Sequence, residues 1–302
     1  MDNTKRKLSD SDLIKELTGR LEAYDKTLKE LKTLNEELKV VNKKLEDSEA
    51  LKSHFISNIT NEIVNPFASI LGLSKNILSA KKEDWKTIIS MVSLIHSEAF
   101  NLDFQFKNIF VAAKLEAGEI SPEILKVDIN SLIEGVMDSF KIEAKKKKIS
   151  VSVDFNFAPG LEKIYYFKTD PEKLRLIISN LISNAIKFSS EGQRIVVNVS
   201  MEDKNLNINV KDHGTGISDE NQKIIFDRFR RLDSGINSIN RGHGLGLSVN
   251  KALLDMLDGT IHINSKKGKG ADFLVSIPEH SSDTDGFSYE GTETFFEDEE
   301  IF

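Results

Sequence analysis

Two asparagines four residues apart, Asn180 and Asn184, lie in a segment with the apolar spacing of a helix. On a helix, this spacing places both side chains on the same side. Two amide oxygens on one helix face suit an octahedral Mg²⁺ that keeps water and phosphate oxygens as its other ligands. Lys187 follows three residues after Asn184, close enough to offset phosphate charge. The segment is therefore compatible with a magnesium-phosphate site.

Glycine-containing segments further along the chain can supply the rest of such a site. Asp212 follows an expected strand, and a carboxylate there can accept the amino proton of adenine. Gly214 and Gly216 allow the backbone to approach the ring and to turn sharply. The run 242–247 opens an expected helix, whose first backbone amides can hold phosphate. Each motif is weak by itself, since closely spaced glycines often mark nothing more than a turn.

The order and spacing of these segments resemble the ATP-binding domain of two-component histidine kinases. The resemblance places the asparagine box at residues 170–188, the first glycine box at 212–216, the phenylalanine box at 226–231, the second glycine box at 242–247 and the last glycine box at 267–273. Gyrase, heat-shock chaperone and mismatch-repair families share this fold, but they lack a preceding helical hairpin. Here residues 114–118 resemble the end of the kinase dimerisation domain. The resemblance therefore covers residues 51–280.

This resemblance implies that the chain binds Mg-ATP, with Asn180 and Asn184 as metal ligands. It assigns nucleotide binding to residues of all five boxes, namely Asn180, Asn184, Lys187, Phe188, Asp212, Gly214, Gly216, Phe229, Arg231, Gly242, Gly244, Leu245, Gly246, Gly268 and Gly270. The polar stretch between Arg231 and Arg241 is expected to be a flexible lid over the nucleotide.

Residues 55–67 resemble the phosphoacceptor box of the same family, with one departure. Aligned on Phe55, Glu62 and Pro66, the position of the acceptor histidine is occupied by Asn61. An amide nitrogen has its lone pair delocalised into the carbonyl, so it is not a competent nucleophile. We therefore expect no phosphotransfer from ATP to position 61.

Other residues of the hairpin leave several activities open. His54 lacks the following glutamate, and His96 is expected to be a packed or surface residue, so neither is favoured as a substitute acceptor. Glu62 and Asn65 are three residues apart and share a helix face. In the family, such a pair is associated with removing phosphate from the partner response regulator. The pair is either this kind of phosphatase group or ordinary helix surface chemistry.

Three functions follow as hypotheses. The chain is a degenerate kinase whose nucleotide state regulates a response regulator receiver domain or a partner kinase. Alternatively, it is an active histidine kinase, if Asn61 is an engineered substitution or if the ATP domain acts in trans. Finally, it is a scaffold without nucleotide chemistry. Enzymatic activity is therefore uncertain from sequence.

Composition limits the classes further. The chain has 302 residues, 39% of them hydrophobic, and no cysteine, which fits a reducing compartment and excludes thiolate metal sites and disulfides. The first ten residues lack the apolar region of a secretory signal, and no stretch is apolar enough to span a membrane. We expect a cytoplasmic protein. There is no basic patch interleaved with aromatic residues, so nucleic acid is not an expected partner.

Charge and aromatic residues set the C-terminal segment apart. Residues 281–302 contain eight acidic residues and no lysine or arginine. Without those eight acids, the formal net charge of −7 becomes about +1. We expect this acidic tail, residues 281–302, to be disordered. Its six aromatic and aliphatic residues are either incidental or dock on a partner or on a groove of this protein.

Heptads mark the N-terminal segment. Leucines and other large apolar residues alternate at 3-4 spacing from Ile14 to Leu45, with Asn35 and Asn42 at the remaining a positions. This pattern is typical of a parallel two-stranded coiled coil, and hence of a dimer. The family resemblance implies a homodimer or a heterodimer with another histidine kinase. A lone amphipathic helix packed on its own domain is the alternative. The register breaks at Glu49 and Lys52, which indicates entry into a different bundle.

The expected architecture combines an α region with an α/β region. It consists of a coiled coil (1–50), a dimeric four-helix-bundle hairpin (51–120), a two-layer α/β sandwich of the histidine kinase-like ATPase fold (121–280) and the acidic tail (281–302). In the sandwich we expect helices at 129–147, 171–188 and 245–257, and strands at 149–156, 163–168, 193–201, 205–212, 259–264 and 271–278. Pro66 should kink the first helix of the hairpin.

Overall fold

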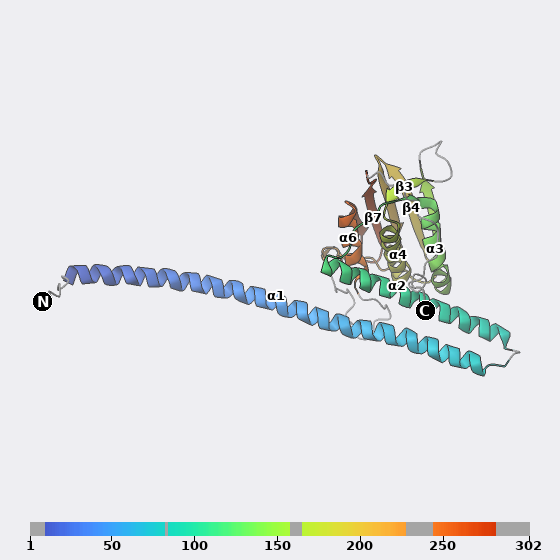
Figure 1. Cartoon of the computed structure of the whole chain (residues 1–302), viewed down its shortest axis with the longest axis horizontal. Coiled ribbons are helices and arrows are strands. Elements are labelled where there is room, and N and C mark those ends of the chain that lie inside the picture. Colours follow the sequence, from blue (N-terminus) through green and yellow to red (C-terminus); the bar gives the residue numbers. More distant parts are fainter. Residues whose placement is uncertain (1–9, 82–83, 158–164, 228–243, 282–302) are drawn as a thin grey trace. The chain divides into compact units, whose positions relative to one another are not determined.

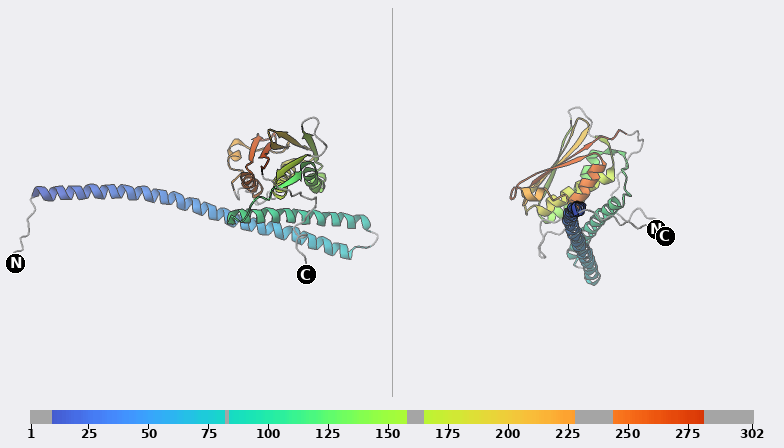
Figure 2. Two further views of the ribbon diagram at one scale, coloured as in Figure 1. Left: turned by 45° about the horizontal axis from the view of Figure 1, so that its top comes forward. Right: turned by 90° about the vertical axis from the view of Figure 1, so that its left-hand side faces the viewer.

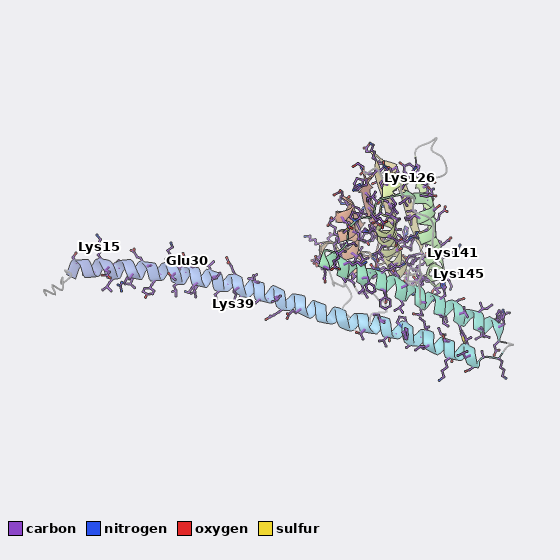
Figure 3. All side chains as sticks on the ribbon, in the orientation of Figure 1. Lys15, Glu30, Lys39, Lys126, Lys141 and Lys145 are labelled. Carbon is purple, nitrogen blue, oxygen red and sulfur yellow. The ribbon has the colours of Figure 1, made fainter. Side chains whose placement is uncertain are left out.

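The computed structural model describes residues 10–81, 84–157, 165–227 and 244–281. The chain divides into two compact units, one up to Ile56 and one from Ser57 onward. Helix α1 (Asp10–Ser79) supplies all of the described first unit. Its large apolar side chains at the heptad positions are exposed, from 52% at Leu17 to 75% at Tyr24, and charged side chains such as Lys15, Glu30 and Lys39 lie between them (Figure 3). An apolar stripe of this kind favours a partner helix, and the coiled coil stays a prediction.

The helical hairpin of the second unit consists of the end of α1 and helix α2 (Trp85–Ala117). The two helices lie side by side and run in opposite directions (Figures 1 and 2). Helix α1 continues through Pro66 and through the predicted break in the heptad register. Helix α2 ends at Ala117 and is capped by Gly118, whose positive φ of 68° allows its amide to bond back to the last turn. In the described part of the chain, no helix is both long and apolar enough to cross a bilayer.

A five-stranded mixed sheet forms one layer of the rest of this unit. Its order is β2-β4-β5-β7-β6, and β2 and β4 are the parallel pair. The strands are β2 (Ser150–Asn156), β4 (Arg194–Glu202), β5 (Asn205–Lys211), β6 (Thr260–Ser265) and β7 (Ala271–Pro278). Helices α3 (Ile129–Lys146), α4 (Pro171–Phe188) and α6 (Gly246–Met256) cover one face of the sheet (Figure 2). The predicted two-layer α/β sandwich is confirmed.

Two short elements complete the unit. Strand β1 (Leu125–Asp128) was not predicted; it pairs antiparallel with β3 (Tyr166–Thr169), which begins three residues later than expected. Four-residue strands carry too few alternations to stand out in a sequence. Helix α5 (Asp219–Gln222) is a single turn after β5.

Strict alternation buries one face of the central strands. In β4, Ile195, Val197 and Val199 are fully buried, and the intervening residues are partly exposed. This period of two is the side-chain pattern of a sheet with one covered face. The covering helices contribute matching apolar stripes, as in α4, where Leu174, Ile177, Ile178 and Leu181 are at most 1% exposed. Because these buried faces hold the strands and helices in register, they also set the positions of the loops that carry the predicted glycine motifs.

Helix α2 packs against the sandwich through aromatic side chains. Phe140 of α3 makes edge-to-face contacts with Phe100 and Phe104 of α2, at centroid distances of 5.3 and 5.7 Å. Lys146 of α3 donates to the hydroxyl of Ser97 at 2.7 Å. Such aromatic pairs add about 0.5–1.5 kcal/mol beyond the area they bury. The hairpin helix is therefore held against the domain at several places.

Asp170 is expected to be an energetically important cap of helix α4. Its carboxylate accepts from the backbone N of Lys173 at 2.9 Å and of Glu123 at 2.7 Å, and from the Lys173 ammonium at 2.5 Å. Asp170→Ala should lower the free energy of unfolding by about 2 kcal/mol, the upper end for loss of a cap, because the residue is also buried. Urea denaturation measures the change. Ser218→Ala is the matched control, since the Ser218 cap of α5 makes no side-chain hydrogen bond; an equal loss in both variants would contradict the assignment.

Candidate functional site

Asp212 stands at the centre of the site, directly after strand β5. It is 6% exposed, and its Oδ1 accepts from the backbone N of Gly214 at 2.8 Å and of Ala271 at 3.2 Å. Burial raises the pKa of Asp212, although the bonds from Gly214 and Ala271 act in the opposite direction. Both bonds go to Oδ1, so Oδ2 can serve a ligand. The carboxylate is therefore fixed in place by the backbone rather than by other side chains.

Glycines are required around Asp212 because backbone segments approach each other there. A Cβ on Gly214 would collide with the carbonyl of Phe188, and one on Gly270 with the carbonyl of Asp212. Gly216, with φ of 63°, would meet the carbonyl of Lys266 in the same way. The predicted glycines thus bring together three segments: the end of α4, the loop after β5 and the turn between β6 and β7.

Ser265 and Gln222 hold the loop after β5 through hydrogen bonds to its backbone. Neither residue was predicted from the sequence. The hydroxyl of Ser265 accepts from the backbone N of Ile217 at 2.8 Å and donates to the carbonyl of Gly270 at 2.6 Å. The amide of Gln222 donates to the carbonyls of Ile217 and Ser265. A buried serine at the end of an alternating strand was the available signal, because a buried hydroxyl must be hydrogen-bonded.

Asn180 lies where helices α4 and α6 meet. It is 3% exposed, and its Nδ2 donates to the Oδ1 of Asn250 on α6 at 2.8 Å. Gly246 allows this approach, since a Cβ on it would lie 3.0 Å from Oδ1 of Asn180. Asn250 is fully buried and was not predicted. Its place among the buried Val249, Leu253 and Leu254 of α6 was the signal that could have identified it.

The end of α4 carries the remaining predicted residues of the asparagine box. Asn184 is half-buried, one turn beyond Asn180. The ammonium of Lys187 lies 5.2 Å above the ring of Phe188. Lys147 caps the helix by donating to the carbonyls of Ile186 at 2.9 Å and Lys187 at 2.7 Å. Burial lowers the pKa of Lys147, and this cap fixes the helix end against which the Gly214 loop packs.

Helix α6 begins at Gly246 and is preceded by Gly244, whose φ of 70° turns the chain into the helix. The N-cap residue Leu245 is apolar, and the first turn has no side-chain cap. Backbone amides at such a helix start can bind an anion. The turn between β6 and β7 closes the opposite side, where the amide of Gly268 donates to the carbonyl of Thr215 at 2.6 Å.

The cluster does not include every predicted residue, because part of the chain is outside the described residues. Phe229, Arg231, Gly242 and the expected lid lie outside the described residues, as does the acidic tail beyond Ser281. Asn61 and Glu62 lie in helix α1, and their side chains are also outside the described residues. Asn65, one turn further, is exposed. The structure thus brings together the described residues of four boxes.

An adenine nucleotide with Mg²⁺ fits the residues that are present. The buried carboxylate of Asp212 offers an acceptor oxygen at a loop whose glycines pack directly against neighbouring backbone. The uncapped start of α6 offers amides for phosphate. Asn180 and Asn184 offer neutral amide oxygens on the neighbouring helix, a ligand type that Mg²⁺ accepts beside phosphate and water.

The family comparison agrees with this geometry. Residues 169–281 match the family described as histidine kinase-, DNA gyrase B-, and HSP90-like ATPase. The matched region begins one residue before the Asp170 cap and ends after β7, so it contains α4, the Asp212 loop, α6 and the β6–β7 turn.

Relatives extend the similarity into the helical region. The sensor protein GacS of Pseudomonas syringae pv. syringae is 30% identical over 260 residues, which cover 83% of this chain and 27% of GacS. The sensor-like histidine kinase SenX3 of Mycolicibacterium smegmatis is 29% identical over 232 residues, 77% of this chain and 59% of SenX3. The chain therefore spans about a quarter of the length of GacS and less than two thirds of that of SenX3. The solved structure of full-length ShkA with AMPPNP has a TM-score of 0.52 at 22% identity, covering 78% of this chain and 46% of ShkA, which shows a shared fold.

Proposed function

We propose that this relative of the sensor histidine kinases, whose residues 169–281 form a histidine kinase-like ATPase domain, is a signalling protein that binds Mg-ATP. The observation that carries the proposal is the buried Asp212 carboxylate, held by two backbone amides in a loop whose close backbone packing requires glycine at 214, 216 and 270. Asn180 and Asn184 would hold Mg²⁺ through their amide oxygens, and Lys187 would offset phosphate charge. When bound, Mg-ATP supplies a phosphoryl group whose charge the metal neutralises.

The position that would receive the phosphoryl group is occupied by Asn61. An amide cannot attack phosphorus, because its nitrogen lone pair is shared with the carbonyl. We therefore propose a degenerate kinase, in which bound nucleotide controls the conformation of the protein and does not phosphorylate it.

A receiver domain of a response regulator or a second histidine kinase is the proposed partner. Glu62 and Asn65 remain on the helix turn after Asn61, where a carboxylate and an amide can orient a water. The exposed apolar stripe of α1 from Ile14 to Leu45 supports pairing with a second α1 helix, from another copy or from a related kinase. Both partners act through parts of the chain outside the ATPase domain.

Incubation with γ-labelled ATP tests the central proposal. We expect saturable, Mg-dependent binding of ATP and no acid-labile label on the chain. Acid-labile label on the wild-type chain would instead show an active kinase. Absence of any ATP binding would contradict the proposal and favour the hypothesis of a scaffold without nucleotide chemistry.

A second experiment tests the phosphatase arm. The full chain, added at stoichiometric concentration, should shorten the lifetime of phosphate on a cognate receiver domain, because Glu62 and Asn65 would orient the attacking water. Glu62→Gln and Asn65→Ala should each restore the spontaneous lifetime, and Lys75→Ala, an exposed residue nearer the end of the same helix, should not. An unchanged lifetime with the wild-type chain removes phosphatase activity and leaves regulation by binding.

A further inference from the structure

Asn108 connects the hairpin helix α2 to the nucleotide site. It is 6% exposed, and its Oδ1 accepts from Nδ2 of Asn180 at 2.8 Å, although 72 residues separate the two in sequence. The second hydrogen of the same Asn180 amide group goes to Oδ1 of Asn250 at 2.8 Å. Three amides from α2, α4 and α6 thus form one hydrogen-bonded chain.

The direction of every amide in this chain is determined by backbone carbonyls. Nδ2 of Asn108 donates to the carbonyl of Phe104 at 3.0 Å, within its own helix. Nδ2 of Asn250 donates to the carbonyl of Ile177 at 3.0 Å. A carbonyl can only accept, so each of these asparagines must present its amide nitrogen to the backbone and its oxygen to Asn180.

Asn180 is consequently left with one orientation. Nδ2 has three acceptors around it: Oδ1 of Asn108, Oδ1 of Asn250 and, at 3.3 Å, the carbonyl of Gly246. The side chain must present Nδ2 to them, because an amide oxygen there would face other oxygens. Its Oδ1 is then the amide atom that faces the side-chain position of Gly246 at the start of α6, where a Cβ would lie 3.0 Å away. That is the helix end whose first amides are without a side-chain cap.

We infer that Asn108 is a positioning residue of the metal-nucleotide site: from the hairpin, it turns the Asn180 amide so that Oδ1 faces the bound magnesium. The inference rests on the proposed function and adds a coupling to it. Docking of α2 on the domain favours the metal-binding orientation of Asn180, and by linkage Mg-ATP favours the docked hairpin. Nucleotide state is thereby communicated to the hairpin through a side-chain contact rather than through the phosphoacceptor position.

Binding measurements with and without the metal test this role. Asn108→Ala removes one acceptor worth about 1 kcal/mol, so the affinity for Mg-ATP should fall about 5-fold. Affinity for ATP in the presence of EDTA should stay within about 2-fold of wild type. Without the metal, Oδ1 of Asn180 has nothing to coordinate, so its orientation no longer affects binding. Asn108→Ser, whose hydroxyl is too short to reach Asn180, should behave in the same way and guards against a folding defect in the alanine variant.

Ser97→Ala is the matched control. It removes the contact between α2 and Lys146 but touches no residue of the amide chain, so both affinities should remain within about 2-fold of wild type. An equal loss with and without metal in the Asn108 variants would show a general packing role and overturn the inference. A gain in Mg-ATP affinity, which would mean that α2 competes with the metal, or no change at all, overturns it as well. If the wild-type chain binds no ATP under either condition, the proposed function itself fails.

Discussion

Asp212→Asn is expected to weaken ATP binding by about 10- to 100-fold, the usual value of a hydrogen bond to a charged group, while leaving the fold at least as stable at neutral pH. The substituted amide can still accept from Gly214 and Ala271 through its oxygen, so the loop keeps its shape. What is lost is the negative charge that, in the proposed function, receives the amino group of adenine. Equilibrium titration with ATP and thermal unfolding of the same variant measure the two effects.

The pH dependence of this variant follows from the raised pKa of Asp212. Burial disfavours the ionised form in the folded chain, so the wild type loses stability as the pH rises from the ordinary carboxyl range through the raised value. The difference in stability between Asp212→Asn and wild type should therefore grow over that window and then level off. ATP binding to the wild type should weaken as the pH falls through the same window, because protonation removes the acceptor charge.

Asp272→Asn provides the control for Asp212→Asn. Asp272 is a neighbouring carboxylate, on strand β7, and accepts from Asn209, whose strand β5 leads to Asp212. We expect its ATP affinity to stay within about 2-fold of wild type. If both substitutions weaken binding equally, the effect comes from the general charge of this sheet edge, and the specific role of Asp212 is wrong.

The sandwich was predictable because its elements have strong periodic patterns. The alternation in β4 and β5 and the helical spacing of α4 each identify a buried face, and the caps of α4 mark its start. Strand β1 was not predictable in this way, since its four residues form a strand through pairing with β3, some forty residues away. Local pattern predicts elements that bury a whole face and misses elements defined by a distant partner.

The residues of the candidate site also fall into those that the local sequence predicts and those that depend on a distant element. The glycines around Asp212 were predictable because they form a visible sequence pattern. The structure explains that pattern, since a side chain at each position would collide with backbone. Asn250 and Ser265 were missed although each lies within an apolar pattern, since a lone polar residue there resembles an exposed position until the opposing element is placed. Asn108 is the clearest case, because its partner Asn180 belongs to another part of the chain. Local spacing therefore indicated the residues of the proposed ligand site, and it missed the polar residues that hold those residues in orientation.

Asn61→His is expected to convert the chain from one without acid-labile phosphate to one that autophosphorylates. Glu62 already follows position 61, and a carboxylate beside an imidazole can act as its base. The imidazole nitrogen keeps an available lone pair near neutral pH, which the amide of Asn61 lacks. Incubation of both proteins with γ-labelled ATP, followed by acid and alkali treatment of the labelled chain, measures the change.

Two variants make this result specific. Asn61→Gln keeps an amide and should remain unlabelled, and the double variant Asn61→His with Asp212→Asn should lose most of the label because its ATP site is weakened. Label in Asn61→His alone would show that the ATPase domain can still reach the acceptor helix, and that one side chain separates this protein from a working kinase. If Asn61→His binds ATP normally yet stays unlabelled, the ATPase domain does not bring ATP close enough to residue 61 for phosphate transfer. In that case nucleotide binding would act on the hairpin through contacts such as that between Asn108 and Asn180, because phosphate transfer would be excluded for more than one reason.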